Sequence, residues 1–323
     1  MSKLFTGWTC AVAALTAATA WAEPRGPEGN VEITVGTSPG GTPDVIMRQM
    51  ARVLAESGLV QNPMVVVNRT GGSWTVSSNY VLGREGDDNL LYAIAQPMIT
   101  TPIVQGFDNT WDKLTPIAMF VRGDLIVFTH ADAPYQTLGD VLEKARAEPM
   151  SVSLAGAQAG STDHLTTALL EQASGAAINY VPFDGGGAAL AAFLGRNTDL
   201  VILPPVEALD LMAEGTIRPL AILSEERRTE PELADIPTAR EQGYEALWGQ
   251  AWGVAGPPGM SAEVADWWGE KIAAMVETPE WEALMAESYF VTDFVGRDGA
   301  AEALQAIYED HLAVLRQVGL SQQ

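Results

Sequence analysis

The stretch VEITVGTSPGGTPD, residues 31–44, sets the architecture expected for the whole chain. It begins as a β-branched strand, turns at Gly40-Gly41 and opens an amphipathic helix over residues 42–57. Pro43 suits an early helical position, where its missing N–H costs nothing, and Asp44 in the first turn favours the helix dipole. Free N–H groups at such a helix start attract a carboxylate or phosphate. An ordinary capped turn explains the segment equally well, so alone it leaves both interpretations open.

The strand–turn–helix unit recurs along the chain, in the βαβ pattern of mostly parallel sheets covered by helices. No internal repeat stands out. The expected strands are residues 31–37, 64–68, 90–95, 117–121, 125–129, 151–155, 178–182, 200–203 and 217–223. The expected helices are residues 42–57, 75–82, 138–147, 162–173, 187–195, 206–213, 262–276 and 300–318. We expect the last two helices to pack back on the first sheet.

The N-terminal residues are predicted to be an export signal. Lys3 is followed by an uncharged apolar run over residues 4–18 and by the small-x-small cleavage pattern of residues 20–22. Cleavage after Ala22 would leave 301 of the 323 residues, which is room for two domains of ordinary size. Cleavage would also remove Cys10, the single cysteine, and with it any disulfide, thiol catalysis or zinc–thiolate site.

The chain is strongly acidic. It has 18 Lys and Arg against 41 Asp and Glu, a formal net charge of −23. The negative electrostatic field of such a chain repels nucleic acid and anionic lipid, so we exclude both as partners. It also repels an anionic ligand at long range, so that capture must depend on local donors inside a cleft. We expect no metal and no cofactor.

Two later junctions share the glycine-rich character of the first. Residues 156–164 (GAQAGSTDH) open a helix, and Ser161 or Thr162 could cap it or donate a hydroxyl to a ligand. Residues 180–187 (YVPFDGGG) follow the next strand, and their glycines leave the backbone open. Sites in α/β sheets form at such strand ends. The closeness of Ser161 and His164 leaves a hydrolase as an alternative, although the base of a triad needs a third group to orient it. His164 is better explained as a packed, hydrogen-bonded residue.

Taken in order, these segments resemble motifs of the substrate-binding proteins of tripartite tricarboxylate transporters, the Bug-type periplasmic receptors. Each motif is weak singly, but their order and spacing are specific. The similar segments are residues 36–44 (GTSPGGTPD), 65–72 (VVVNRTGG), 160–165 (GSTDHL), 180–186 (YVPFDGG), 233–243 (LADIPTAREQG) and 256–259 (GPPG).

The resemblance implies a periplasmic-binding-protein type II-like fold, in which two α/β domains flank a ligand cleft. Residues 23–129 with 249–323 would form domain 1 and residues 130–248 domain 2, with hinges near Thr129 and Gly249. It also implies a periplasmic receptor that holds a small organic acid mainly through backbone N–H groups and delivers it to membrane transporter subunits. We expect a monomer, which is the default for a receptor that must close and deliver. A periplasmic sensor that feeds a signalling partner is the alternative. The candidate ligand-binding residues are Thr37, Ser38, Gly40, Gly41, Thr42, Asp44, Trp74, Gln96, Gly160, Ser161, Thr162, His164, Phe183, Gly185, Gly186 and Pro204.

The sequence departs from the family pattern at four positions. Thr37 and Ser38 replace an aromatic residue and a proline, and Asp184 replaces a lysine. Trp74 follows the glycine loop, where the family has small residues. If these side chains face the cleft, the pocket gains hydroxyls and an aromatic wall. Otherwise Trp74 is a core residue and the two hydroxyl residues form a solvated turn.

Overall fold

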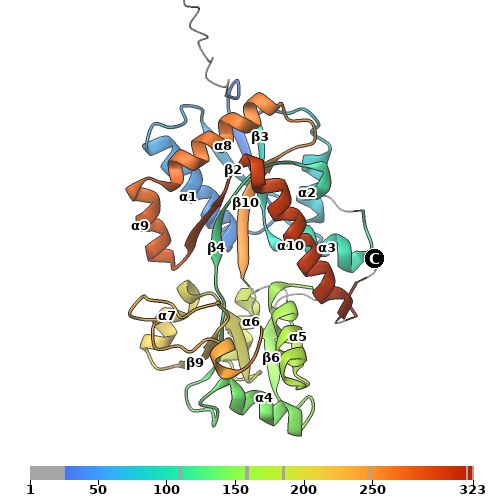
Figure 1. Ribbon diagram of the computed structural model, residues 1–323, viewed down its shortest axis with the longest axis vertical. Helices are drawn as coiled ribbons and strands as arrows, with labels where there is room; N and C mark the ends of the chain where they lie inside the picture. The colour runs from blue at the N-terminus through green and yellow to red at the C-terminus, as the bar shows by residue number, and fades with distance from the viewer. Residues whose placement is uncertain are drawn as a thin grey trace, which may run out of the picture.

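The computed structural model describes residues 26–108, 111–156, 160–183, 186–246, 249–317 and 319–321. Two sheets form two lobes, one above the other in Figure 1. The first lobe holds a six-stranded sheet of order β11-β4-β10-β3-β1-β2, and the second lobe a five-stranded sheet of order β7-β6-β8-β5-β9. No helix within the described residues is long and apolar enough to cross a membrane.

The strands of the first lobe are β1 (Val31–Val35), β2 (Met64–Asn68), β3 (Leu90–Ile94), β4 (Thr115–Gly123), β10 (Gln250–Gly256) and β11 (Val291–Val295). Those of the second lobe are β5 (Ile126–His130), β6 (Ser153–Gly156), β7 (Asn179–Pro182), β8 (Leu200–Leu203) and β9 (Ile217–Ile222). The α-helices are α1 (Thr42–Glu56), α2 (Thr75–Leu82), α3 (Gln96–Gln105), α4 (Leu138–Ala147), α5 (Thr162–Ser174), α6 (Gly186–Leu194), α7 (Pro205–Ala213), α8 (Ala262–Val276), α9 (Pro279–Ser288) and α10 (Arg297–Gln317).

Both sheets are mixed, which corrects the prediction of mostly parallel sheets. β1 pairs in parallel with β2 and β3, and β6 pairs in parallel with β7 and β8. Antiparallel strands complete each sheet: β10 joins β3 to β4, β11 pairs with β4, and β5 lies between β8 and β9. The reason is that β5 and β10 enter their sheets from the opposite lobe rather than through a βαβ crossover.

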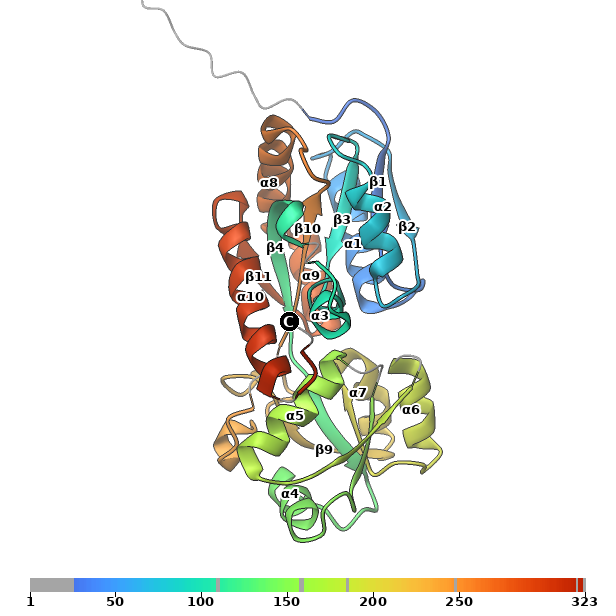
Figure 2. The same cartoon turned by 90° about the vertical axis from the view of Figure 1, so that its right-hand side faces the viewer.

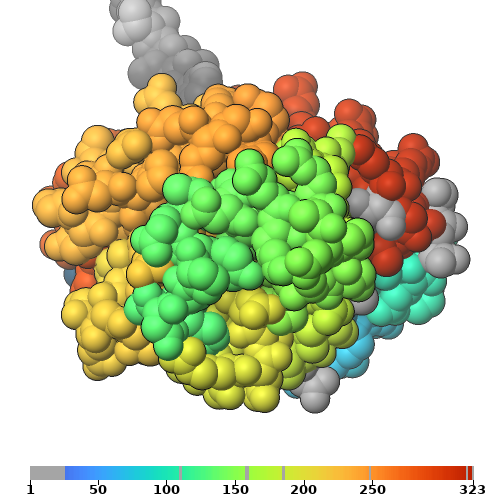
Figure 3. All heavy atoms as spheres, turned by 90° about the horizontal axis from the view of Figure 1, so that it is seen from below, coloured from blue at the N-terminus to red at the C-terminus, as the bar shows by residue number. Residues whose placement is uncertain are grey.

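The helix α1 shows how the sequence pattern builds the first lobe. Ile46, Met47, Met50 and Leu54 recur at helical spacing and are fully buried. Burying each such side chain contributes about 1.5–3 kcal/mol. The C-terminal helices α8 and α10 pack on β4, as predicted for the end of the chain. The helix α4 lies at the end of the second lobe that is far from the first lobe. Figure 3 views the molecule from this end, with the green segment around α4 in front.

The chain passes from the first lobe to the second between Gly123, the last residue of β4, and Ile126, the first residue of β5. The hinge expected near Thr129 therefore lies a few residues late, because Thr129 is a buried residue inside β5. The return segment enters β10 at Gln250, which pairs with Gly123. The two crossing segments thus lie side by side, and Gly249 is at the second of them, as expected.

Candidate functional site

The first two glycine-rich junctions follow β1 and β6, so each lies at the carboxyl edge of the parallel part of its sheet. In Figure 2, α3 of the first lobe lies directly above α5 and α7 of the second lobe. A hydrogen bond joins these edges, because the Thr162 hydroxyl at the start of α5 donates to Gln96 Oε1 at the start of α3. The two edges therefore face each other across the space between the lobes.

The buried carboxylate of Asp44 holds the first junction together by accepting hydrogen bonds from residues of the loop and of its neighbours. Gly40, in the left-handed region with φ 84°, donates its N–H to Asp44 Oδ2 at 2.9 Å. Asn68 Nδ2 donates to Asp44 Oδ1 at 2.8 Å, and Arg48 Nε lies 3.0 Å from both carboxylate oxygens. The Asp44 side chain is 2% exposed. Its carboxylate is thus occupied by the loop, and we assign it to positioning rather than to ligand contact.

The charge of Asp44 is stabilised where it lies. Burial acts to raise the pKa of its carboxyl, but hydrogen bonds from Arg48, Gly40 and Asn68 outweigh burial and hold the pKa below its ordinary value. The nearest cation, Arg48, also donates to Asn68 Oδ1 at 3.0 Å. Arg48 is therefore committed to the loop and to its own ion pair.

His164 has the same place in the second junction. Gly160, with φ 81°, donates its N–H to His164 Nδ1 at 3.1 Å. The imidazole stacks on the Tyr180 ring with centroids 4.4 Å apart, and burial lowers its pKa. Ser161 is the N-cap of α5: its Oγ accepts the His164 backbone N–H at 3.4 Å and bonds the Tyr180 hydroxyl at 3.1 Å. The imidazole is therefore packed and hydrogen-bonded, as the sequence indicates.

The two junctions repeat one arrangement at one spacing. Each junction begins with a glycine. A second glycine follows four residues after it, a threonine six residues after it, and a side chain that accepts a hydrogen bond eight residues after it. An aromatic ring also closes over the first glycine, where a Cβ atom would overlap Trp74 in the first lobe and Tyr180 in the second. The matched sets are Gly36, Gly40, Thr42 and Asp44 in the first lobe and Gly156, Gly160, Thr162 and His164 in the second.

The junctions differ in the donors they leave open. The N-cap of α1 is Gly41, which has no side chain to cap the helix. The N–H groups of Thr42 and Asp44 have no hydrogen-bond acceptor within the described part of the chain. In the second lobe, Ser161 caps the corresponding N–H of His164. The first lobe therefore offers the more open anion-binding helix start.

Trp74 is a core residue that also borders a cavity of about 470 Å³ between α2 and α3. Its side chain is 5% exposed, and its ring lies 5.9 Å from that of Tyr92. Ser73 and Trp74 both have positive φ, at 48° and 74°, a strained conformation for non-glycine residues. Burial of the indole offsets this strain, because a residue of this size dominates local packing energy. Trp74 thus supports the first junction from beneath Gly36.

The remaining candidate residues lie around the two junctions. Thr37 is half-buried and Ser38 is exposed, as a solvated turn requires. Phe183 is half-buried and packs against the apolar cluster of the second lobe, while Gly186 at the start of α6 is exposed. Pro204 is the N-cap of α7. Gly185 and Asp184 lie outside the described residues.

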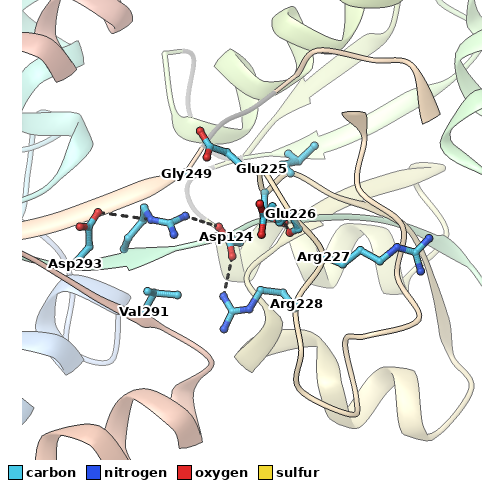
Figure 4. Close-up of a pocket in the computed structure, with 11 residues that line it drawn as sticks. Asp124, Glu225, Glu226, Arg227, Arg228, Gly249, Val291 and Asp293 are labelled. Carbon is cyan, nitrogen blue, oxygen red and sulfur yellow. Dashed lines mark hydrogen bonds and ion pairs between the residues drawn. The ribbon is translucent and has the colours of Figure 1, made fainter. Parts of the chain in front are cut away.

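A cavity between the lobes adjoins the crossing segments (Figure 4). Its volume is about 620 Å³, and its walls come from β11 and from residues 223–228, which follow β9. Buried Asp124 binds Arg122 Nη1 at 3.1 Å and Arg228 Nη1 at 2.7 Å, which links the two lobes. The third arginine of the lining, Arg227, is paired with Glu241. Because every arginine here already has a carboxylate partner, we assign this cavity to the hinge and not to anion capture.

Two facing lobes with glycine-rich helix starts define a two-lobed binding protein of the periplasmic type. A model of the tripartite tricarboxylate transporter family receptors matches residues 46–305. The chain belongs to this family.

Relatives and solved structures agree with this assignment. BugT of Bordetella pertussis is 29% identical over 244 residues, which are 72% of each chain. An R. palustris protein solved with adipate has a TM-score of 0.81 at 23% identity, over 91% of this chain and 99% of that one. The periplasmic binding protein BugD has a TM-score of 0.77 at 22% identity, over 92% of this chain and 100% of that one. MatC from Rhodopseudomonas palustris, solved with malate, has a TM-score of 0.74 at 20% identity, over 90% and 99%.

Proposed function

We propose that this receptor captures one small organic acid between its lobes and delivers it to the membrane subunits of a tripartite tricarboxylate-type transporter. The observation that carries the proposal is the repeated junction, with one anion-binding helix start in each lobe. The Gln96–Thr162 hydrogen bond joins the start of α5 in the second lobe to the start of α3 in the first lobe, and α3 follows β3, the strand beside β1. Closure of the lobes about the paired segments at Gly123 and Gly249 would enclose the acid.

Neutral groups would hold the carboxylate. The three junctions contain no Lys or Arg, and Arg48 is engaged by Asp44 and Asn68. The open N–H groups of Thr42 and Asp44 would donate to the carboxylate from the first lobe. Such charge-assisted hydrogen bonds are roughly twice as strong as neutral ones. Gly40 contributes by shaping the turn, because its own N–H is used by Asp44.

The relatives support the ligand class and the location. Two proteins of the same fold were solved with adipate and with malate, and another is described as a periplasmic binding protein. Cleavage of the export signal after Ala22, which lies outside the described residues, would release a mature monomer into the periplasm. The lobe built on β1–β4, β10 and β11 and the lobe built on β5–β9 would then close as two domains.

The local geometry favours a receptor over a hydrolase. A serine nucleophile needs a hydrogen bond to its base. Instead, the Ser161 hydroxyl bonds Tyr180, and His164 Nδ1 accepts the Gly160 N–H. Ester turnover that disappears in Ser161→Ala would contradict the proposed function.

Calorimetric titration of the mature protein tests the proposal. The panel is acetate, succinate, malate, adipate and citrate, which spans one to three carboxylates. We expect saturable one-to-one binding of at least one acid, and a rise in Tm with its concentration because the ligand binds only the folded state. Absence of binding by every acid, in a sample shown to be folded by circular dichroism, would overturn the proposal.

A further inference from the structure

The side-chain amide of Gln96 has a buried N–H₂ group that forms no hydrogen bond with the described residues of either junction. Gln96 begins α3 directly after β3 and is 8% exposed. Its Oε1 accepts the hydroxyl of Thr162 from the opposite lobe. Its Nε2 is buried and has no hydrogen-bond partner among the described residues. Buried polar groups are normally paired, so an amide nitrogen left open at a lobe interface needs an explanation.

A chain of hydrogen bonds connects this amide to Thr162 and Gln250. Gln250 Nε2 donates to Thr162 Oγ1 at 3.3 Å, and the Thr162 hydroxyl then donates its one hydrogen to Gln96. The carbonyl end of Gln96 is therefore held toward the second lobe. Its amino end, with two N–H donors, is held away from Thr162.

The amide lies at the hinge end of the space between the lobes. Gln250 is the first residue of β10 and pairs with Gly123, so the chain of hydrogen bonds adjoins both crossing segments. A cavity of about 50 Å³ borders Gln96, Met119 and Gly249. Its remaining walls are His311 and apolar side chains of β3, α3, β10 and α10, and it is too small for a whole ligand.

We propose that Gln96 Nε2 donates to a second oxygen group of the bound acid, whose first carboxylate is held at the helix starts. The inference rests on the proposed function and adds a specificity to it: the site takes acids with two oxygen-bearing acceptor groups in preference to matched monoacids. A neutral amide suits this place, because it supplies donors without the desolvation cost of a buried charge.

A purely structural role predicts a different outcome. If Gln96 only bridges the lobes, its replacement weakens the protein and leaves the choice of ligand unchanged. Gln96→Met keeps the length and volume of the side chain and removes both polar ends. Gln49→Met is the matched control, because Gln49 Oε1 on α1 is also buried and has no hydrogen-bond partner in the described part of the chain.

The experiment measures Tm without ligand and Kd by calorimetry for wild type, Gln96→Met and Gln49→Met. The probes are two matched pairs, adipate with hexanoate and malate with 3-hydroxybutyrate, in which each second acid lacks one carboxylate. Gln96→Met is expected to change the Tm by less than about 2 °C, since it removes an unpaired buried N–H group but also the acceptor of the Thr162 hydroxyl. It should weaken the preferred diacid about 10- to 100-fold, with little change for its monoacid. Gln49→Met is expected to leave every Kd unchanged.

Each outcome decides between a ligand-binding role and a purely structural role of Gln96. Equal loss of affinity for diacid and monoacid, or a lower Tm with unchanged affinity, overturns the role of Gln96 and leaves the receptor function intact. A wild type that binds the diacid no better than the monoacid also overturns it. If the wild type binds none of these four acids or the wider panel, the proposed function fails and this inference fails with it.

Discussion

The two glycine-rich junctions have the same backbone but opposite electrostatics. In the first lobe, an ionised Asp44 accepts the Gly40 N–H, with Arg48 and Asn68 beside it. In the second lobe, a neutral imidazole accepts the Gly160 N–H and stacks on Tyr180. In both junctions the left-handed glycine donates its N–H to a side-chain acceptor four residues later, charged in one and neutral in the other. The difference also decides which helix start remains open, because only the second junction has a serine cap.

The largest expected effect comes from removing the acceptor of the first junction. Asp44→Ala leaves the Gly40 N–H, Asn68 and Arg48 without their common partner. We expect a loss of about 3 kcal/mol in the free energy of unfolding, measured with urea, because hydrogen bonds to a charged group are the strong ones. His164→Ala, the matched change in the second junction, should cost clearly less. Equal losses would show that the charge contributes nothing to the loop.

The next effect tests the uncapped helix start. Gly41→Ser copies Ser161 into the first junction and should cap the Asp44 N–H that we assign to the ligand. Its Cβ atom would lie 2.7 Å from Thr37 Oγ1 and 3.1 Å from Thr37 Cγ2, so the threonine side chain has to shift. We expect affinity for the acid to fall roughly 10-fold, as for the loss of one hydrogen bond. The free energy of unfolding should stay within about 0.5 kcal/mol, since serine and glycine are both accepted N-caps. Unchanged affinity would remove the first junction from the site.

The smallest effect is a pH dependence confined to the second junction. Because burial lowers the pKa of His164, the neutral ring stabilises the fold fully above the unfolded pKa of about 6.5. That stabilisation is lost as the pH falls from there through the folded pKa. His164→Asn keeps an acceptor for Gly160 and does not titrate, so its stability should fall less between pH 7 and pH 5. The pKa of His311, lowered to about 4 by burial, gives the same slope in both proteins and cancels in the difference. Parallel pH profiles would contradict the assignment.

Local signals predicted many elements well. The helices at residues 75–82, 138–147 and 262–276 and the strands at residues 64–68 and 200–203 have the predicted bounds. The helices α4 and α8 have clear amphipathic periodicity, and the strands β2 and β8 are short apolar runs rich in β-branched residues. Four elements were missed, namely α3, α9, β10 and β11. Prolines at positions 97 and 102 hid α3, and β11 has no buried residue that would produce an alternating pattern.

The sequence by itself determined the family, the α/β class and the glycine turns, because steric limits on φ and helix-capping chemistry act within a few residues. Only the tertiary structure decided which side chains those turns use. It placed Trp74 beneath Gly36, committed the carboxylate of Asp44 to the first junction, and joined Gln96 to Thr162, which lies 66 residues away in the chain. The physical reason is range: backbone geometry is set by neighbours in the chain, whereas burial and hydrogen-bond partners are set by segments that meet only after the lobes have folded.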